Sequence, residues 1–178
     1  MINLINKKFK IDGNRIYLRI LEVKDATQEY CYWLNDPEVN KYLETKGSTT
    51  EELKEYINEK NKSSKCLFFG IFYRENNGHI GNLKLEPIDF DGKRATFGIL
   101  VGDKKYWGMG IGIEATKLIV DWAFDILNLK EVNLGVIAEN KAAVKTYEKV
   151  GFHIDNIEKS SIKSDNKFYD KITMSIKK

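Results

Sequence analysis

The chain contains few of the residues that bind metals or form crosslinks, with two cysteines and two histidines among 178 residues. Cys31 and Cys66 lie in apolar surroundings without a C-x-x-C spacing, so we expect two buried, reduced thiols and no metal site. The longest apolar run, near residues 66–73, is far too short to span a membrane, and the N-terminus lacks the apolar segment of a signal peptide. These absences predict a cytoplasmic protein that does not bind membranes.

A strong charge of either sign is also missing. The chain carries 29 basic and 26 acidic residues, a net charge of +3, and they are spread along its length. This weak excess does not indicate a nucleic-acid partner. With 42% hydrophobic residues and no repeat or low-complexity segment, the sequence predicts one globular domain over residues 1–178. We expect a monomer or a homodimer.

The most informative segment is a glycine-rich loop, Tyr106-Trp107-Gly108-Met109-Gly110-Ile111-Gly112, which is followed by an amphipathic helix. Glycine tolerates positive φ and lets a ligand approach the backbone closely. Three glycines at alternate positions before a helix therefore expose a row of main-chain N–H groups at the positive end of the helix dipole. The loop predicts a site for a phosphate or a diphosphate.

Two other kinds of phosphate loop do not fit this segment. A P-loop requires Gly-Lys followed by Ser or Thr, and no such tripeptide follows these glycines. The dinucleotide-binding motif can be aligned from Gly108 and Gly110, but Ile113 stands in place of its third glycine. Taken alone, the loop has a second interpretation as a tight turn between a strand and a helix.

Hydrophobic periodicity and turn residues predict secondary structure in the order βααβββαβαββ. The expected strands are 16–20, 66–73, 79–88, 94–101, 132–136 and two more after Gly151 that are joined by a turn at Asp165-Asn166. The expected helices begin at capping boxes at 25–28 and 49–52, then cover 115–126 and the segment from Asn140 to Gly151. We expect an α/β (α+β) fold with a mixed, mostly antiparallel seven-stranded sheet and helices on both faces.

A second informative segment runs from Asn140 to Phe152, with the sequence NKAAVKTYEKVGF. Asn140 is a favourable N-cap and Gly151 a favourable helix end. Tyr147 falls two turns into this helix on its apolar face, where a buried phenol needs a hydrogen-bond partner. Taken alone, Tyr147 is also compatible with a purely structural role in the core.

Together, the glycine loop after a meander and the segment from Asn140 to Phe152 resemble the GNAT superfamily of acetyl-CoA-dependent N-acyltransferases, especially its RimJ/RimL-type branch. The family motif R/Q-x-x-G-x-G/A corresponds to Trp107-Gly108-Met109-Gly110-Ile111-Gly112, with Trp107 in place of the usual Arg or Gln. The resemblance covers nearly the whole chain and implies a single GNAT-like domain. It also implies that the amides of this loop hold the diphosphate of acetyl-CoA, with no metal involved.

The resemblance further implies a direct attack of an amine on the thioester. Pantetheine would lie between the strands 99–101 and 132–137 and pair with the backbone of Leu100 and Val101. Tyr147 would act as general acid for the departing CoA thiolate, and Asn140 and Ala143 would contact the cofactor. A non-catalytic acetyl-CoA-binding or regulatory module is the alternative, because the usual base is missing.

Many relatives carry a Glu one residue before the Phe-Gly-Ile of the last meander strand, and this chain has Thr96 there. Glu86 on the neighbouring strand is the substitute that we expect as base, with Asp36 and Glu38 as weaker candidates. The residues expected to shape the acceptor pocket are Trp33, Asp36, Tyr42, Glu86 and Phe168. By similarity to relatives, the acceptor is an amino sugar on a nucleotide, a protein N-terminus or a polyamine.

Overall fold

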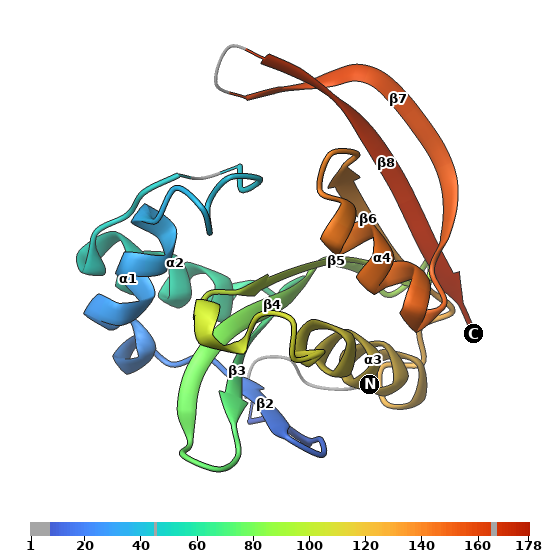
Figure 1. Ribbon diagram of the computed structural model, residues 1–178. Coiled ribbons are helices and arrows are strands. Elements are labelled where there is room, and N and C mark those ends of the chain that lie inside the picture. Colours follow the sequence, from blue (N-terminus) through green and yellow to red (C-terminus); the bar gives the residue numbers. More distant parts are fainter. Residues whose placement is uncertain (1–7, 45, 165–166) are drawn as a thin grey trace.

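The structure is a computed structural model that describes residues 8–44, 46–164 and 167–178 (Figure 1). Its strands are β1 (Lys10–Asp12), β2 (Ile16–Ile20), β3 (Leu67–Tyr73), β4 (Gly78–Asp89), β5 (Arg94–Val101), β6 (Glu131–Ile137), β7 (His153–Ser164) and β8 (Lys167–Lys177). Its α-helices are α1 (Gln28–Asn35), α2 (Thr50–Lys62), α3 (Ile111–Asp125) and α4 (Lys141–Val150). The predicted order is confirmed, with β1 as an additional strand. The turn predicted at Asp165-Asn166 lies outside the described residues.

One sheet contains all of these strands, in the order β1-β2-β3-β4-β5-β6-β8-β7. Neighbouring strands are antiparallel except for β5 and β6, which are parallel. The predicted mixed, mostly antiparallel sheet is therefore confirmed, although it has eight strands and not seven. The parallel pair lies in the middle of the sheet, where helix α3 forms the connection between its two strands.

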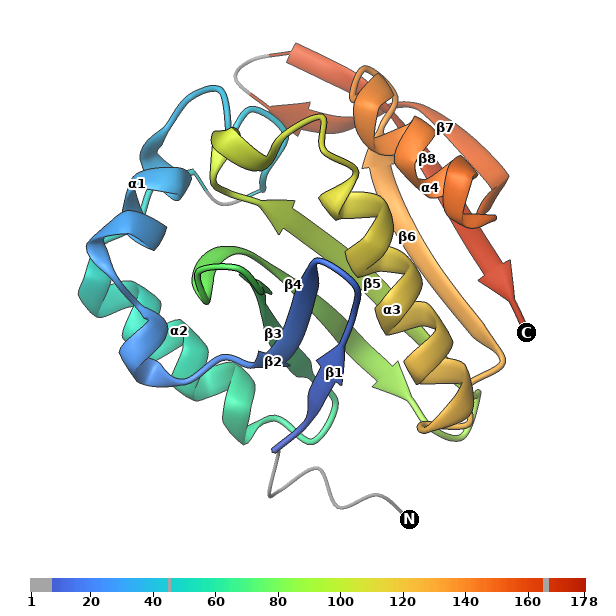
Figure 2. The same cartoon turned by 60° about the horizontal axis from the view of Figure 1, so that its bottom comes forward.

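Helices cover both faces of the sheet, as predicted (Figures 1 and 2). On one face, α3 packs on the larger core, in which Ile111, Ala115 and Ile119 meet the strands. On the other face, α1 and α2 close a second core around Leu53, Ile57 and other buried side chains. Among the described residues, no helix is long and apolar enough to cross a membrane.

Local capping explains where the helices begin and end. Thr49 caps α2 in a capping box with Glu52, as predicted, and Asn140 caps α4 by accepting from Ala143 N at 3.3 Å. Gly151 ends α4 at φ 111°, a conformation that favours glycine. The capping box expected at 25–28 is wrong. Thr27 alone caps α1, because a short 3-10 helix, Val23–Asp25, precedes it and has a capping box of its own.

Candidate active site

The candidate site is built where β5 and β6 separate. The two strands pair only from Arg94↔Glu131 to Thr96↔Asn133, after which they diverge. Over residues 97–101, the edge of β5 that faces β6 therefore has no strand beside it within the described part of the chain. An extended ligand can pair with such an edge as an added strand.

Alternation along β5 decides which main-chain groups face this gap. Gly102 N donates to Ile80 O at 2.9 Å, so the even-numbered residues of this strand direct their main-chain groups towards β4. Lys93 O, at the other end, accepts from Lys130 N at 2.7 Å just before β6. The odd-numbered residues of β5 consequently direct their main-chain groups towards β6.

The groups that face the gap are those of Ile99 and Val101. The predicted pairing of pantetheine with Leu100 needs correction, because Leu100 lies opposite Asn82 and turns its main chain towards β4. Val101 remains a candidate, but its oxygen already accepts a 2.8 Å hydrogen bond from the indole Nε1 of Trp107. Its amide and the main chain of Ile99 are the groups left for a ligand.

Two residues of the glycine loop, just before α3, have a left-handed backbone conformation: Gly108 at φ 73° and Gly110 at φ 78°. Gly110 is the N-cap of α3, and the first helical hydrogen bond runs from Glu114 N to Gly110 O at 3.1 Å. Within the described residues, the amides of residues 108–112 donate to no protein acceptor. The structure thus gives the loop the row of free N–H groups that an anion requires.

Arg15, in the turn before β2, is a site residue that sequence reasoning missed. Its Nε donates to Glu114 Oε2 at 3.0 Å, and its Nη1 donates to Met109 O within the glycine loop. Glu114 also accepts from Arg15 N at 2.8 Å, so the carboxylate holds this turn against α3. The positions 15 and 114 are far apart in the sequence, and no periodicity or local motif connects them.

Tyr147 lies beside the point where β5 and β6 separate. Its ring packs edge-on against Phe97, with 6.2 Å between ring centroids, and Phe97 directly follows the last paired residue of β5. The side chain is 7% exposed, and burial raises the pKa of the phenol to about 12. Burial is the only cause of this shift, with no hydrogen bond contributing to it among the described residues. Asn140, at the start of the same helix, uses its side-chain oxygen as a cap.

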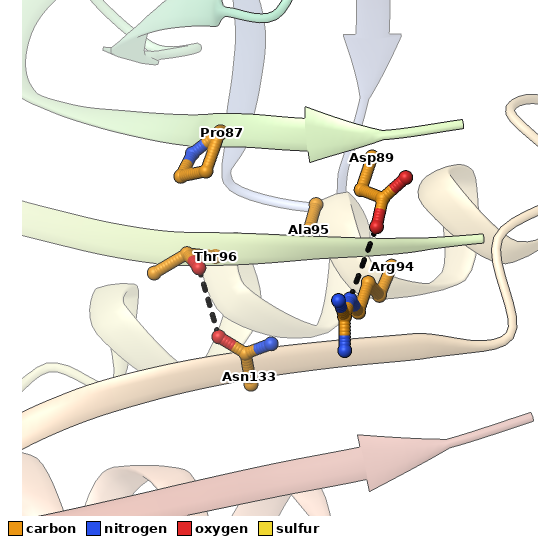
Figure 3. Close-up of a pocket in the computed structure, with 6 residues that line it drawn as sticks. All are labelled: Pro87, Asp89, Arg94, Ala95, Thr96 and Asn133. Carbon is orange, nitrogen blue, oxygen red and sulfur yellow. Dashed lines mark hydrogen bonds and ion pairs between the residues drawn. The ribbon is translucent and has the colours of Figure 1, made fainter. Parts of the chain in front are cut away.

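On the face of the sheet opposite Tyr147, a pocket of about 300 Å³ lies next to the last residues at which β5 and β6 are still paired (Figure 3). Thr96 Oγ1 donates to Asn133 Oδ1 at 2.9 Å at one end of this pocket. An ion pair between Arg94 and Asp89, 3.2 Å long, lies at the other end. Thr96, the residue found where many relatives carry a Glu, therefore offers a hydroxyl and no base.

Glu86 is poorly suited to the predicted role of general base. Its carboxylate accepts from Lys60 Nζ at 2.8 Å and from Lys84 Nζ at 3.2 Å. Although burial opposes ionisation, the two lysines hold the pKa of Glu86 below its usual range. A carboxylate with a lowered pKa has a weaker tendency to take a proton from an amine, and each oxygen of this one already accepts a hydrogen bond from a lysine.

The residues expected in the acceptor pocket differ in burial and in their partners. Trp33 is buried in the second core, where it packs on Gly102 and the ring of His79. Asp36 ends α1 and pairs with Lys104 at 2.7 Å. Phe168 is 63% exposed on β8, near the end of the described part of the hairpin.

Tyr42, another of the expected acceptor residues, makes a hydrogen bond between segments that are far apart in the sequence. Its hydroxyl donates to Glu139 O at 3.3 Å, joining the segment after α1 to the turn between β6 and α4. Trp33 is a buried residue of the second core, and its role in an acceptor pocket stays a prediction. Among the described residues, no group of three or more His, Cys, Asp and Glu side chains is arranged to hold a metal.

Comparisons with known proteins place these features in a family. A family model described as an acetyltransferase (GNAT) domain matches residues 15–153. The uncharacterized N-acetyltransferase p20 of Bacillus licheniformis is 29% identical over 168 residues, which cover 92% of this chain and 93% of that protein. Spermidine N(1)-acetyltransferase of Escherichia coli (strain K12) is 36% identical over 75 residues, 42% of this chain and 40% of that protein.

A solved structure agrees over more of the chain. The structure of spermidine N-acetyltransferase from Vibrio cholerae in complex with CoA and spermine has a TM-score of 0.84 and 25% sequence identity, and the match covers 92% of this chain and 95% of that one. The separated central strands, the glycine loop at the start of α3 and the matching family model lead to one conclusion. The chain belongs to the GNAT family of acetyltransferases.

Proposed function

We propose that this protein transfers the acetyl group of acetyl-CoA to a primary amine by direct attack within a ternary complex, as in the RimJ/RimL-type branch of the family. One observation carries the proposal: the phenol of Tyr147 lies beside Phe97, where β5 and β6 separate, while the free amides of the glycine loop follow the far end of the same strand edge. A ligand with an anionic end and a thioester end fits that arrangement.

In this proposal, acetyl-CoA is held mainly by main-chain groups. The amides of residues 108–112 bind the diphosphate, and the pantetheine amides pair with Ile99 and the Val101 amide on the free edge of β5. Trp107 keeps the loop close to that edge through its hydrogen bond to Val101 O. Asn140 and Ala143 stay proposed contacts, although their mutual hydrogen bond already serves to start α4.

Tyr147 is the proposed general acid for the CoA thiolate. Because burial raises its pKa to about 12, the phenol keeps its proton at neutral pH and is ready to donate it. A thiol in water has a pKa of about 8.5, which would make the transfer uphill. The same apolar surroundings disfavour a thiolate, so they raise the pKa of the departing thiol and reduce that difference.

The amine must reach the thioester without its proton, and its own pKa sets the cost. An amine with a pKa near 8 gives up its proton at pH 7 for about 1.4 kcal/mol, whereas an alkyl amine near 10.4 requires over 4 kcal/mol. Glu86 and Asp36 are both paired with lysines in this structure. We therefore propose a weakly basic acceptor, such as an amino sugar or a protein N-terminus, that needs no strong base.

Acetylation of a polyamine is the second candidate, and the similarity to spermidine N(1)-acetyltransferase supports it. The paired carboxylates oppose it, because a polycation is best held by carboxylates that are free to bind it. Release of CoA thiol, measured over matched panels of amino sugars, peptides with free N-termini and polyamines, separates the candidates. CoA-dependent thermal stabilisation without thiol release on any panel would favour the non-catalytic binding module instead.

A further inference from the structure

The glycine loop of this chain has Trp107 where the family motif has a basic or amide side chain, and the indole is directed to Val101 O. We propose that Arg15 supplies the missing side-chain contact and binds the diphosphate of acetyl-CoA. The inference rests on the proposed function, since it adds one residue to the same cofactor site. In this proposal, the cation that binds the diphosphate comes from the turn before β2 and not from the glycine loop.

Two hydrogen bonds from the guanidinium and one from the main chain fix the position of Arg15. Its Nε donates to Glu114, its Nη1 donates to Met109 O, and its main-chain N donates to the same Glu114 carboxylate. A Cβ atom placed on Gly110 would lie 3.4 Å from Nη2. The guanidinium therefore sits against the left-handed N-cap of α3, next to the free amides.

Nη2 is the part of Arg15 that is left to bind a ligand. Nε and Nη1 are used within the protein, whereas Nη2 has no acceptor among the described residues. The side chain is 39% exposed, so a ligand at the loop can reach it. A planar guanidinium held at two of its nitrogens offers its remaining N–H groups in a fixed direction, which suits phosphate oxygens.

Two other cations, Lys104 and Arg74, are less suited to this role. Lys104 is paired with Asp36 at 2.7 Å and Glu38 at 3.0 Å, on the side of the chain that follows α1. Arg74 follows β3 beside Arg15, and its Nη1 pairs with Asp12 at 2.7 Å. Arg74 is 43% exposed, close to the value for Arg15, but within the described residues its side chain has no hydrogen bond to the loop. It is therefore a matched control.

The test compares acetyl-CoA with S-acetylpantetheine, a donor that carries the same thioester and no diphosphate. For Arg15→Gln we expect kcat/KM with acetyl-CoA to fall about 10- to 100-fold, as for the loss of a hydrogen bond to a charged group, and kcat/KM with S-acetylpantetheine to change less than about twofold. Arg15→Lys, which keeps the charge, should recover part of the loss. Arg74→Gln should behave as wild type with both donors.

Four results would overturn the inference. An equal loss with both donors would mean that Arg15 acts through the fold as a whole, and no loss with either would mean that it does not contact the ligand. A loss with acetyl-CoA that is as large for Arg15→Lys as for Arg15→Gln would mean that Arg15 only supports the loop whose amides bind the diphosphate. A loss that disappears with 3′-dephospho-acetyl-CoA would assign Arg15 to the 3′-phosphate and not to the diphosphate. A loss that persists with 3′-dephospho-acetyl-CoA but is absent with S-acetylpantetheine supports the inference.

Calorimetric titration with CoA keeps the inference separate from the proposed reaction. If the wild type binds CoA but acetylates no amine, the proposed function fails. The role of Arg15 is still supported in that case if Arg15→Gln and Arg15→Lys bind CoA more weakly than Arg74→Gln does. If the wild type does not bind CoA, both fail. Melting temperatures of the three variants show whether each one is folded.

Discussion

The indole Nε1 of Trp107 donates a 2.8 Å hydrogen bond to the main-chain oxygen of Val101. This bond joins the glycine loop to the last residue of β5, on the edge that faces the gap. Trp107 thus has a structural role at a position where the family motif has Arg or Gln. The bond also leaves Val101 N as the group of that residue that can pair with a ligand.

Replacing Trp107 by Phe should weaken acetyl-CoA binding about 2- to 10-fold, because the loop loses one hydrogen bond that fixes it to β5. The ring is 40% exposed and Phe keeps most of its apolar contact, so the melting temperature should change little. Calorimetric titration with acetyl-CoA measures the effect. An unaltered dissociation constant in a folded variant would show that the loop holds its position without this bond.

Replacing Tyr147 by Phe should lower turnover about 10²- to 10⁴-fold and leave acetyl-CoA affinity nearly unchanged. The ring contacts with Phe97 and Phe152 persist in this variant, and only the proton donor is lost. Steady-state kinetics on an accepted amine and titration with acetyl-CoA give the two values. Tyr32→Phe, which removes a hydroxyl from a residue of α1 that is 65% exposed, serves as control. Turnover equal to wild type would remove Tyr147 from the mechanism.

The pH profile should show no decline due to Tyr147 at moderately alkaline pH. A raised pKa means that the acid form persists to higher pH, and burial raises this one to about 12, so the phenol stays protonated up to about pH 11. We expect kcat/KM to rise through the pKa of the acceptor amine and then to stay level to pH 10. A decline with a midpoint below pH 10 that is absent from Tyr147→Phe would contradict this assignment.

The features of the site that the sequence predicted well are local ones. Gly110 and Gly151 mark the ends of helices because only glycine adopts their left-handed conformation cheaply, and Asn140 caps the helix that it begins. The meander follows from two short turns, Asn77-Gly78 and Asp91-Gly92, between alternating apolar runs. In each case the necessary information lies within a few residues of the feature.

What could not be predicted depends on partners from distant segments. Glu86 looks like a strand carboxylate in the sequence, and only the fold brings Lys60 from α2 beside it. The pairing of Arg15 with Glu114 is hidden for the same reason. The family resemblance implies that Leu100 pairs with pantetheine, but which main-chain groups of β5 face the gap depends on the register of β5 with β4, which the sequence does not give.

Gly110→Ala should abolish or strongly weaken acetyl-CoA binding, whereas Gly47→Ala should not. The two glycines have nearly equal φ values, 78° and 81°, so both substitutions should cost about 1–2 kcal/mol of stability through the left-handed backbone. Only the Cβ at residue 110 enters the anion site, 3.4 Å from Arg15 Nη2. Equal acetyl-CoA affinity in the two variants would mean that the diphosphate does not lie against Gly110.

His79 should make the fold less stable as the pH falls. Its ring packs among Phe72, Trp33 and Tyr30, with centroid distances of 5.0, 5.1 and 5.5 Å, and burial lowers its pKa to about 4. An unfolded histidine has a pKa near 6.5, so the unfolded chain binds a proton that the folded chain excludes. The stability present above pH 6.5 is therefore lost progressively down to pH 4, by about 3 kcal/mol in total.

His79→Phe should remove most of that contribution. A phenyl ring fits the same aromatic surroundings and has no nitrogen to protonate, and neither ring nitrogen of His79 makes a regular hydrogen bond within the described residues that would be lost. Urea unfolding at pH 7 and pH 5 gives the difference in unfolding free energy for each protein. His153→Phe is the matched control, because His153 is the other histidine of the chain and its side chain is 59% exposed. If the two variants and the wild type lost the same stability between these pH values, His79 would not be the group that titrates.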